Sequence, residues 1–294
     1  MRASVSLGNG ALPADERRAL RLLGLLEADT FAAWVAAPLL ETSPERAEHL
    51  VEELVDARLL DVAGPDETGQ IRYRFHDLVR VFARERALAE EPEADRRAAL
   101  GRALGCWLAL AEAAEQRLPD TVDRVGGGSA RRWSLPPGAV RGLVADGLAW
   151  FDAERLALTA AVEQAAELDL DELAWELAAS MVTYLPVRQA WDSCPRALEA
   201  TLAACRRAGN RRGEGCALVV YALSQLNLMR PERGLPLARQ ALERLREVGD
   251  GPNLTWAMFE VADGLAIARD EVRSSRSGRC PSCISPACTT ASGA

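Results

Sequence analysis

Lysine is absent from the sequence, because all 35 basic residues of this 294-residue chain are arginine. The loop that cradles nucleotide phosphates, G-x-x-x-x-G-K-[ST], requires a lysine, and so does catalysis through a Schiff base. The chain therefore holds no site of either kind. Any nucleotide hydrolysis linked to it would have to be carried out by another domain.

Long apolar runs are also missing. No stretch approaches the roughly 20 apolar residues that cross a bilayer as a helix. The first residues, MRASVSLGNGALPADERR, contain no apolar core of a secretory signal. These features predict a cytoplasmic protein without a membrane anchor. The net charge of −8 gives no general attraction to nucleic acid or to an anionic lipid surface, so it favours a protein partner.

Cysteine is present, but its pattern predicts little chemistry. Four cysteines stand singly within helical patterns, where buried free thiols are the ordinary interpretation: Cys106, Cys194, Cys205 and Cys216. The Ser- and Cys-rich stretch 271–294 adds Cys280, Cys283 and Cys288, which suggest zinc, although a structural zinc site takes four ligands. We expect this stretch to be disordered. It is hypothesised to come from a shifted reading frame, which resequencing the gene would test.

Residues 12–90 read as helices followed by a hairpin and a further helix. ERRALRLLGLLEA and TFAAWVAAPLL predict two short helices, the second beginning after Asp29 or Thr30. A third helix has Ser43 as its cap and Pro44 at its first position, and it is expected to end near Arg58. Together with the hairpin, these helices predict a winged-helix domain, preceded by a disordered start at 1–11.

The predicted hairpin lies in LLDVAGPDETGQIRYRF. Turn-forming residues separate its two extended halves, and Ile71, Tyr73 and Phe75 alternate with polar residues in the second half. The next helix is expected to turn Leu78, Val81 and Phe82 inward. No further strand is predicted beyond this point, so the fold class is mostly α.

The remainder reads as helices with one interruption. Connecting helices are expected over 91–123, a Gly/Pro-rich linker or exposed loop over 124–140, and amphipathic helices over 141–270, one of them spanning 171–191. Gly209 and its neighbours are echoed by Gly249 and its neighbours, a shift of 40 residues, which predicts a tetratricopeptide-like solenoid. The alternative is coincidence among alanine-rich helices. Whether the glycines at 126–128 form a hinge stays open.

The pair His76-Asp77 lies where the hairpin meets the next helix, in RYRFHDLVRVFARERA. As a catalytic pair it would need a nucleophile, and the sequence contains no G-x-S-x-G elbow or other candidate. As a local feature, His76 would close the junction and Asp77 would cap the helix. We therefore predict that the chain is not an enzyme, with no catalytic residues and no metal site.

Residues 12–87 resemble the winged-helix part of the STAND signalling ATPases, specifically NB-ARC regulators related to actinobacterial antibiotic regulatory proteins. The resemblance is carried by LPADERRALRLLGLL, FAAWVAAPLL, AEHLVEELVDARLLD and YRFHDLVRVFARERA. AWFDAERLALTAAV, AGNRRGEGCALVVYAL and RGLPLARQALERLREVGD resemble the tetratricopeptide region of the same proteins. In that family the motif Met-His-Asp reads the phosphates of a nucleotide, so the resemblance implies that His76 is a nucleotide sensor and that Asp77 supports its turn. Phe75 replaces the methionine.

The resemblance also implies a partner that this sequence lacks. ADP or ATP would be bound by an upstream NTPase domain, and no P-loop or Walker B strand precedes residue 12. The chain itself is predicted to need no cofactor. We thus expect a regulatory fragment whose winged helix acts as a lid and whose helical repeats bind a protein or peptide.

Two alternatives remain: a stand-alone winged-helix regulator that binds DNA, and a repeat scaffold with a vestigial winged helix. The third helix exposes mostly acidic side chains, which a duplex would repel: Glu45, Glu48, Glu52, Glu53 and Asp56. A basic cluster could touch a DNA backbone or form surface ion pairs: Arg72, Arg74, Arg80, Arg84 and Arg86. The acidic helix disfavours DNA binding.

Overall fold

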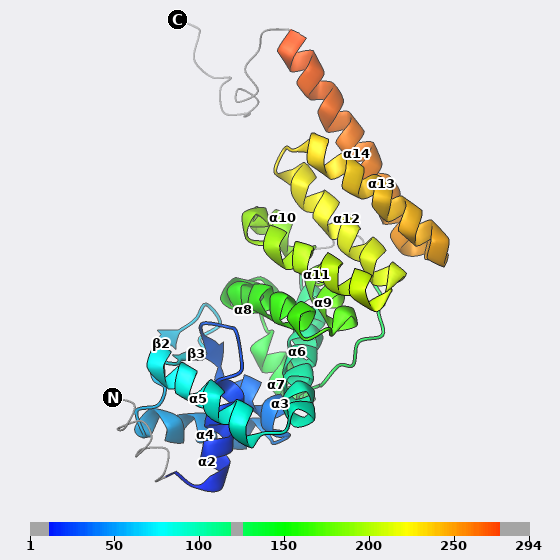
Figure 1. Ribbon diagram of the computed structural model, residues 1–294. Coiled ribbons are helices and arrows are strands. Elements are labelled where there is room, and N and C mark those ends of the chain that lie inside the picture. The colour runs from blue at the N-terminus through cyan, green and yellow to red at the C-terminus, as the bar shows by residue number, and fades with distance from the viewer. Residues whose placement is uncertain (1–11, 119–125, 277–294) are drawn as a thin grey trace, which may run out of the picture.

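The computed structural model describes residues 12–118 and 126–276. The predicted disordered start at 1–11 and the three tail cysteines lie outside these residues, as does part of the predicted linker. The described chain is mostly helical, with one small antiparallel sheet, which confirms the mostly α fold class (Figure 1). None of the described helices is long and apolar enough to cross a membrane.

The first helices follow their local sequence signals closely. Helix α2 spans Ala14–Leu23, and α4 spans Pro44–Asp56. The hydroxyl of Ser43 accepts a hydrogen bond from the main-chain N–H of Arg46 at 3.3 Å, and Pro44 takes the first helical position. The predicted cap and the predicted end of this helix are therefore confirmed.

The predicted helix over residues 30–40 is wrong in its first half. Residues Phe31–Ala32 form strand β1, followed by a 3-10 turn, Ala33–Val35, and the short helix α3, Ala36–Leu40. Phe31 pairs with Tyr73 in the sheet, and its ring lies 6.4 Å from that of Tyr73. This pairing across the chain overrides the local helical preference.

The hairpin is present where the turn residues predicted it. Strands β2, Asp61–Pro65, and β3, Ile71–Arg74, are antiparallel, and the sheet order is β1-β3-β2. The turn is built on Asp66, whose Oδ1 accepts hydrogen bonds from the N–H groups of Thr68 and Gln70 at 2.9 and 3.0 Å. The pattern failed in one respect, because Arg72 is buried and Ile71 is exposed.

Helix α5, Asp77–Glu90, packs with a different face from the one predicted. Its buried stripe is Val79, Ala83 and Ala87, whereas Leu78 and Val81 are exposed. The helix approaches the end of α2 closely, because a Cβ added at Gly24 would lie 2.6 Å from the Cβ of Ala83. The small residues of α5 thus decide which side meets the core.

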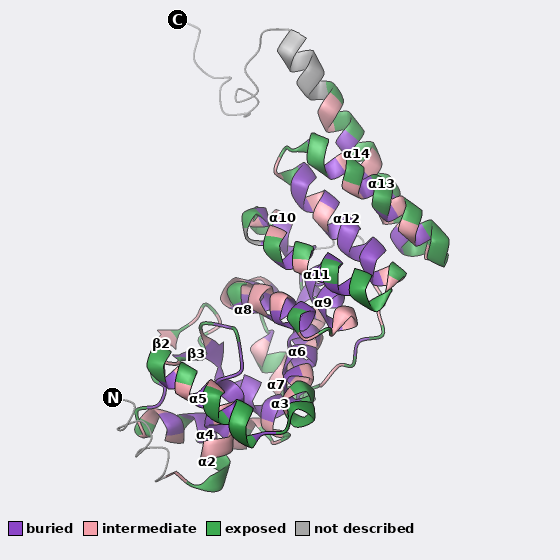
Figure 2. Cartoon of the chain, in the orientation of Figure 1, coloured by how far each residue is buried: buried purple, intermediate pink, exposed green. Residues whose placement is uncertain are grey.

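Helix α6, Glu93–Glu115, joins the first half of the molecule, residues 12–90, to the second half, residues 126–276. From Ala99 to Glu115 it exposes no residue, so it is covered on all sides (Figure 2). Its Trp107 meets Trp34 of the first half edge to face, with ring centroids 5.4 Å apart. One hydrophobic core therefore runs through both halves.

Beyond α6 the helices form antiparallel pairs. After the short α7, Pro137–Leu143, the pairs are α8, Gly147–Glu167, with α9, Asp171–Ala179; α11, Pro195–Ala208, with α12, Arg211–Asn227; and α13, Pro231–Val248, with α14, Gly251–Arg276. The predicted helix over 171–191 is broken into α9, α10, Tyr184–Arg188, and a 3-10 turn, Trp191–Ser193. Helix α14 extends into the stretch that was predicted to be disordered.

The 40-residue repeat has a structural counterpart in the turns between paired helices. Asp169, Gly209 and Gly249 all have positive φ, at 51°, 69° and 71°. The residue after each donates its N–H to a carbonyl five residues back, at 2.9 to 3.1 Å. This is the left-handed helix end that glycine favours. The 40-residue echo in the sequence identified two of these turns, at Gly209 and Gly249. It did not identify the third, where Asp169 stands in place of glycine.

The second helix of each pair lies in one layer. Helix α12 contacts both α9 and α14, so these three helices line one side of the array. Residues 126–136, which we call the strap, run across this layer without regular secondary structure. The composition of the predicted linker, 124–140, correctly indicated the lack of secondary structure in the strap, but its last residues, 137–140, belong to α7, where Pro137 takes the first helical position. The composition also did not indicate that the strap is held by the helices it crosses.

Candidate functional site

The structure places His76 at the surface, just before α5. Its main-chain carbonyl accepts hydrogen bonds from the N–H groups of Val79 and Arg80 at 2.8 and 3.0 Å, so His76 itself is the N-cap residue. Asp77 is the first helical residue rather than the cap. Both side chains are exposed, and neither forms a hydrogen bond or ion pair with another residue in the described part of the chain.

Apolar side chains are exposed next to His76. Leu78 is 48% exposed and Val81 is 51% exposed, one turn apart on the same side of α5. Burying these apolar side chains against a partner would contribute favourable binding free energy. The start of α5 therefore combines an unpaired imidazole with an uncovered apolar surface.

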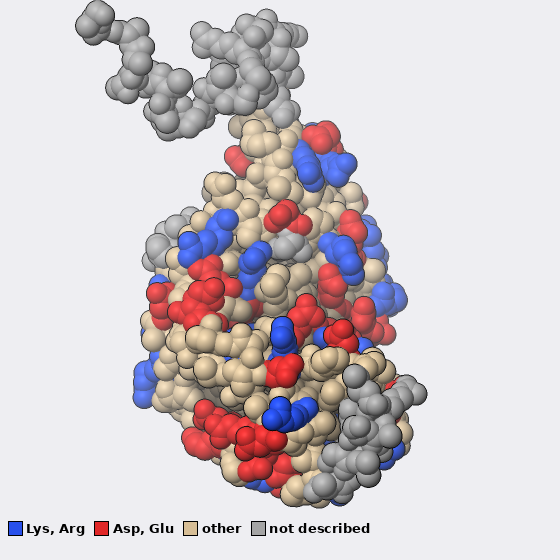
Figure 3. All heavy atoms as spheres, turned by 90° about the vertical axis from the view of Figure 1, so that its left-hand side faces the viewer, with Lys and Arg blue, Asp and Glu red and all other residues tan. Residues whose placement is uncertain are grey.

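The charges of the first half do not suit a nucleic acid. Helix α4 exposes four acidic residues: Glu45, Glu48, Glu52 and Asp56. Figure 3 shows acidic side chains gathered on the lower part of the face in view. Residues 12–90 form this lower part. This surface would repel a phosphate backbone.

Most arginines of the predicted basic cluster are already paired. Arg80 and Arg84 lie within 3.9 and 2.6 Å of the carboxylate of Glu27, and Arg86 pairs with Glu90 one turn along α5. Arg72 is buried. Of the five, Arg74 alone is exposed with no ion pair to another described residue. The cluster thus offers little free positive charge.

Arg72 belongs to a buried polar junction between the two halves. Its guanidinium pairs with Glu154 of α8 and donates to the carbonyl of Thr30 at 3.2 Å. The second carboxylate oxygen of Glu154 accepts a hydrogen bond from the indole N–H of Trp107 at 2.9 Å. Arg72 also lies 3.7 Å from a carboxylate oxygen of the buried Asp66. Since these charges are buried, each needs an opposite charge beside it. The hairpin is therefore fixed to α8 through a salt bridge that joins residues 82 positions apart.

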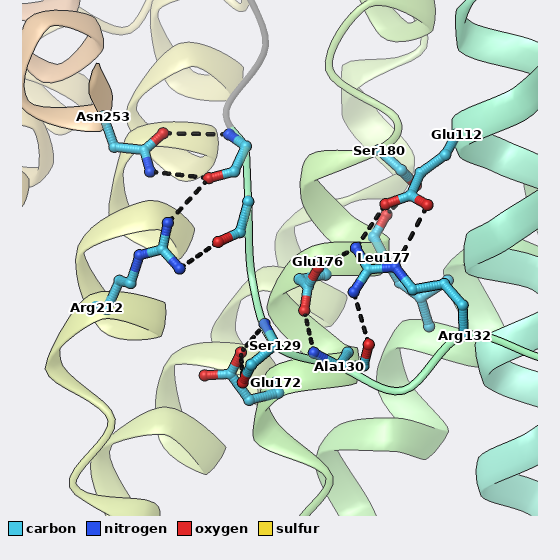
Figure 4. A network of polar contacts seen from close by, with 12 residues as sticks. Glu112, Ser129, Ala130, Arg132, Glu172, Glu176, Leu177, Ser180, Arg212 and Asn253 are labelled. Carbon is cyan, nitrogen blue, oxygen red and sulfur yellow. Dashed lines mark hydrogen bonds and ion pairs between the residues drawn. The ribbon is translucent and has the colours of Figure 1, made fainter.

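The strap is gripped first at its glycines (Figure 4). The side-chain amide of Asn253 in α14 forms two hydrogen bonds with the main chain of Gly126, both at 3.2 Å. Its oxygen accepts from the N–H of Gly126, and its NH2 group donates to the Gly126 carbonyl. Arg212 of α12 donates to the carbonyls of Gly126 and Gly127, and Asp250 holds its guanidinium at 2.8 Å. Each contact is to the main chain, and Gly127 has a positive φ of 81°, a conformation that glycine adopts readily.

Two glutamates of α9 hold the next part of the strap. Glu172 accepts hydrogen bonds from the N–H and hydroxyl of Ser129 at 3.0 and 3.1 Å, and Glu176 accepts from the N–H of Ala130 at 2.7 Å. Arg132 then reaches back to Glu176 and to Glu112 of α6, with a distance of 2.5 Å between its Nη2 and Oε1 of Glu112. Figure 4 shows these carboxylates pointing at the strap from both sides.

The two glutamates titrate differently although they lie one turn apart. Burial raises the pKa of both carboxyls. At Glu172, hydrogen bonds from Ser129 and Asn210 more than offset burial, so its pKa lies below the ordinary value. At Glu176, burial outweighs the bonds from Ala130 and Arg132, so its pKa lies above it. The Glu112 carboxylate, followed by that of Glu176, raises the pKa of Arg132, which keeps this guanidinium charged.

Glycine is required at two places where the strap passes the helices. A Cβ added at Gly128 would collide with the carboxyl group of Glu176 and with the indole of Trp175. A Cβ added at Gly105, inside α6, would collide with the carbonyl oxygen of Arg131. Both the strap and the helix beside it are therefore shaped for this close approach.

Cavities lie beside the strap at two places along its length. One of about 190 Å³ is lined by Gly126, Gly127, Trp175 and residues of α6. The other, of about 690 Å³, is lined by residues 129–133 of the strap and by the start of α9. The strap thus fills only part of the space on this side of the helical array.

Other chemistry is not supported by the described residues. Among them, no group of three or more His, Cys, Asp or Glu side chains is placed to hold a metal ion. Cys106, Cys205 and Cys216 are free and buried, as predicted, and Cys194 is buried as well. Burial raises the pKa of the Cys205 thiol to about 12, so its reactive thiolate form is scarce at neutral pH.

Comparison with known proteins finds relatives among bacterial regulators. Regulatory protein AfsR of Streptomyces griseus is 42% identical over 112 residues, which cover 38% of this chain and 11% of that protein. The Streptomyces coelicolor protein of the same name is 44% identical over 115 residues, 37% of this chain and 11% of its own length. No protein-family model and no solved structure matches the chain. This chain is thus similar to a small part of much longer regulatory proteins.

Proposed function

We propose that this chain is a non-catalytic regulatory module. In this proposal, residues 12–90 are a winged helix that acts as a lid and senses a bound nucleotide through His76. Residues 141–270 are tetratricopeptide-like repeats that bind a protein or peptide. The observation that carries the regulatory role is the similarity to the two Streptomyces regulatory proteins.

The start of α5 supports the sensor role. His76 is exposed and has no side-chain partner among the described residues, and it stands at a helix N-terminus, where the helix dipole and free N–H groups favour an anion. An imidazole there can donate a hydrogen bond to a phosphate oxygen. Leu78 and Val81 beside it supply apolar surface on which a nucleotide-binding domain could pack. The nucleotide, ADP or ATP, would be held by that separate domain.

The helical pairs support the partner-binding role. Each pair repeats the same left-handed turn at a spacing of 40 residues, and the second helices form a continuous layer. Stacked pairs of this kind present one extended surface made from successive repeats. A protein or peptide is the class of ligand that such a surface fits.

The lid proposal is tested by adding this chain to a separately expressed nucleotide-binding domain of the STAND family. Calorimetric titration of the chain alone with ADP and ATP should give no binding. Association of the chain with the ADP-loaded domain should be tighter than with the empty domain. His76→Ala should remove this difference, whereas His49→Ala, which changes the other exposed histidine, on α4, should keep it.

Three results would count against this function. Tight ADP binding by the chain alone would show that the chain has a nucleotide site of its own, although its sequence contains no P-loop. Association that does not depend on ADP or on His76 would leave the winged helix without a sensor role. A salt-sensitive mobility shift with duplex DNA would favour the stand-alone DNA-binding regulator instead.

A further inference from the structure

The strap is held largely through its main chain, as proteins often hold a bound peptide. Asn253 forms paired hydrogen bonds with the main chain of Gly126, and Arg212 adds bonds to two strap carbonyls. Glu172 and Glu176 accept from two consecutive main-chain N–H groups. Side chains that bind a main chain provide affinity for any extended segment, and sequence is read only where a side chain must fit.

Two strap positions are read by their side chains. At Gly128 there is no room for a Cβ between Glu176 and Trp175. At Arg132 the guanidinium is shared by Glu112 and Glu176, so a positive, forked side chain is required. The surface therefore selects a glycine followed four residues later by an arginine. Gly-x-x-x-Arg is the pattern that it fits.

The groups that receive the strap come from separate elements that the fold has already assembled. Glu172 and Glu176 belong to α9, Arg212 to α12 and Asn253 to α14, three helices that contact one another in sequence. With the strap in place, two of these four are nearly buried, Glu176 at 4% exposed and Asn253 at 1%, and the other two are half-buried. A surface with several inward-facing polar groups is a built site rather than a solvated face.

We infer that this side of α9, α12 and α14 is a binding surface for a Gly-x-x-x-Arg segment of a partner protein, and that the strap is its built-in competitor. The inference rests on the proposed partner-binding role of the helical pairs and adds how that role is regulated. The strap and the partner segment use the same hydrogen bonds, so only one can be seated. The apparent affinity for the partner is the intrinsic affinity multiplied by the fraction of molecules with the strap released.

Release of the strap is tested first, in the full chain. Gly128→Ala places a Cβ against Glu176 and Trp175 without altering any receiving residue. The matched control is Gly138→Ala, because a Cβ at Gly138 meets nothing within 4 Å. Trypsin cleavage after Arg131 and Arg132, followed by mass spectrometry, should be faster in the first variant and unchanged in the control.

Binding is tested next with a fluorescein-labelled peptide of residues 126–136, GGGSARRWSLP, by fluorescence anisotropy. The peptide should bind the Gly128→Ala chain at least about tenfold more tightly than it binds the wild-type chain or the control. Peptides that carry Gly128→Val or Arg132→Ala should lose most of this binding. Asn253→Ala, added to the Gly128→Ala chain, should weaken it as well.

Several results would overturn the inference. One is equal peptide affinity for the wild-type and Gly128→Ala chains, which would mean that the strap covers nothing. Another is a released strap with no peptide binding, which would make the surface a simple seat for the linker. A wild-type dimer in light scattering that Arg132→Ala dissolves would replace the separate partner by a second copy of the chain.

A second variant protects the test against misfolding. If Gly128→Ala lowers the cooperativity of thermal unfolding, Ser129→Pro removes the N–H that bonds to Glu172 at an exposed position instead. Unchanged trypsin cleavage in both variants would show that these contacts do not hold the strap, and would overturn the inference. The lid function is judged by ADP-dependent association, so its failure and a failure here are separate results.

Discussion

The two halves of the molecule present their polar groups in opposite ways. At the start of α5, His76 and Asp77 are exposed and have no partner among the described residues. On the helical pairs, Glu172, Glu176 and Asn253 are bonded to the strap. A partner of the first surface meets it directly, whereas a partner of the second must first displace part of the chain. Binding at the start of α5 is therefore possible in every molecule, whereas binding at the helical pairs depends on release of the strap.

The buried junction tests whether the two halves act as one body. Glu154→Ala would leave the buried Arg72 guanidinium with only its longer ion pair to Asp66, at 3.7 Å, and would remove the acceptor of the Trp107 indole N–H. We expect a loss of about 3–5 kcal/mol in the free energy of unfolding, measured with urea. The control Glu163→Ala breaks an exposed pair with Arg196 and should cost at most about 1 kcal/mol. Equal losses would mean that the halves are held by apolar packing alone.

The burial of Glu260, on the last helix of the layer that bears the strap, is tested by the pH dependence of the free energy of unfolding. Glu260 on α14 is 4% exposed and lacks a hydrogen-bond partner for one carboxylate oxygen. Burial, aided by Asp263, raises its pKa from 4.5 to about 8. The folded chain thus keeps this proton up to about pH 8, while the unfolded chain releases it near pH 4.5. The free energy of unfolding should therefore fall as the pH rises through this window, by roughly 1.4 kcal/mol for each unit of pKa difference.

Glu260→Gln is the variant that isolates this effect, since its side chain does not ionise. Thermal unfolding between pH 5 and pH 8 should show a smaller decline in stability for the variant than for the wild-type chain. Parallel pH profiles would show that Glu260 is solvated in the folded chain. The strap-bound Glu172 has a lowered pKa, so its contribution has the opposite sign and is lost as the solution becomes acidic.

Two glycines of α6, one beside the strap and one away from it, test whether the strap rests on this helix. Gly105→Ala would place a methyl group against the carbonyl of Arg131, and we expect it to cost roughly 1–3 kcal/mol or to release the strap. Gly101→Ala, one turn earlier, meets only a Leu170 carbon at 4.0 Å. It should stabilise the helix by up to about 1 kcal/mol. Urea unfolding and trypsin cleavage of the strap report both effects. Similar results for both variants would show that the strap does not rest on Gly105.

The smallest expected effect is at the open surface. His76→Ala removes an exposed side chain that has no bond to another described residue, so the free energy of unfolding should change by less than about 0.5 kcal/mol. Urea unfolding checks this value. A larger loss would indicate that His76 stabilises the hairpin junction, which is the structural alternative to a sensor. A small loss would make any change in association attributable to recognition.

Features set by neighbouring residues were predictable from the sequence. Ser43 and Pro44 began α4 as expected, turn residues placed the hairpin, and Gly209 and Gly249 marked equivalent turns. Each depends on backbone preferences within a few residues. The local pattern also located His76 at a helix start, although it assigned the cap to Asp77.

Features set by distant partners were not predictable. Strand β1 exists because Phe31 meets Tyr73, and Arg72 is buried because Glu154 lies 82 residues away. The strap was recognised as irregular from its glycines, but nothing local identifies Glu172 or Asn253 as its acceptors. One signal was available in the sequence. A glycine in the middle of a helix, such as Gly105, often marks a close approach by another backbone.

Gly105 and Gly128 have a consequence for the evolution of this architecture. The two residues lie on different elements, yet both exist to let the same eleven-residue segment, 126–136, lie flat. A side chain at either position blocks the seat, so neither glycine is useful without the other. Homologous chains should therefore retain both or lose both. A natural variant with a bulky residue at one position alone would be expected to carry a permanently released strap.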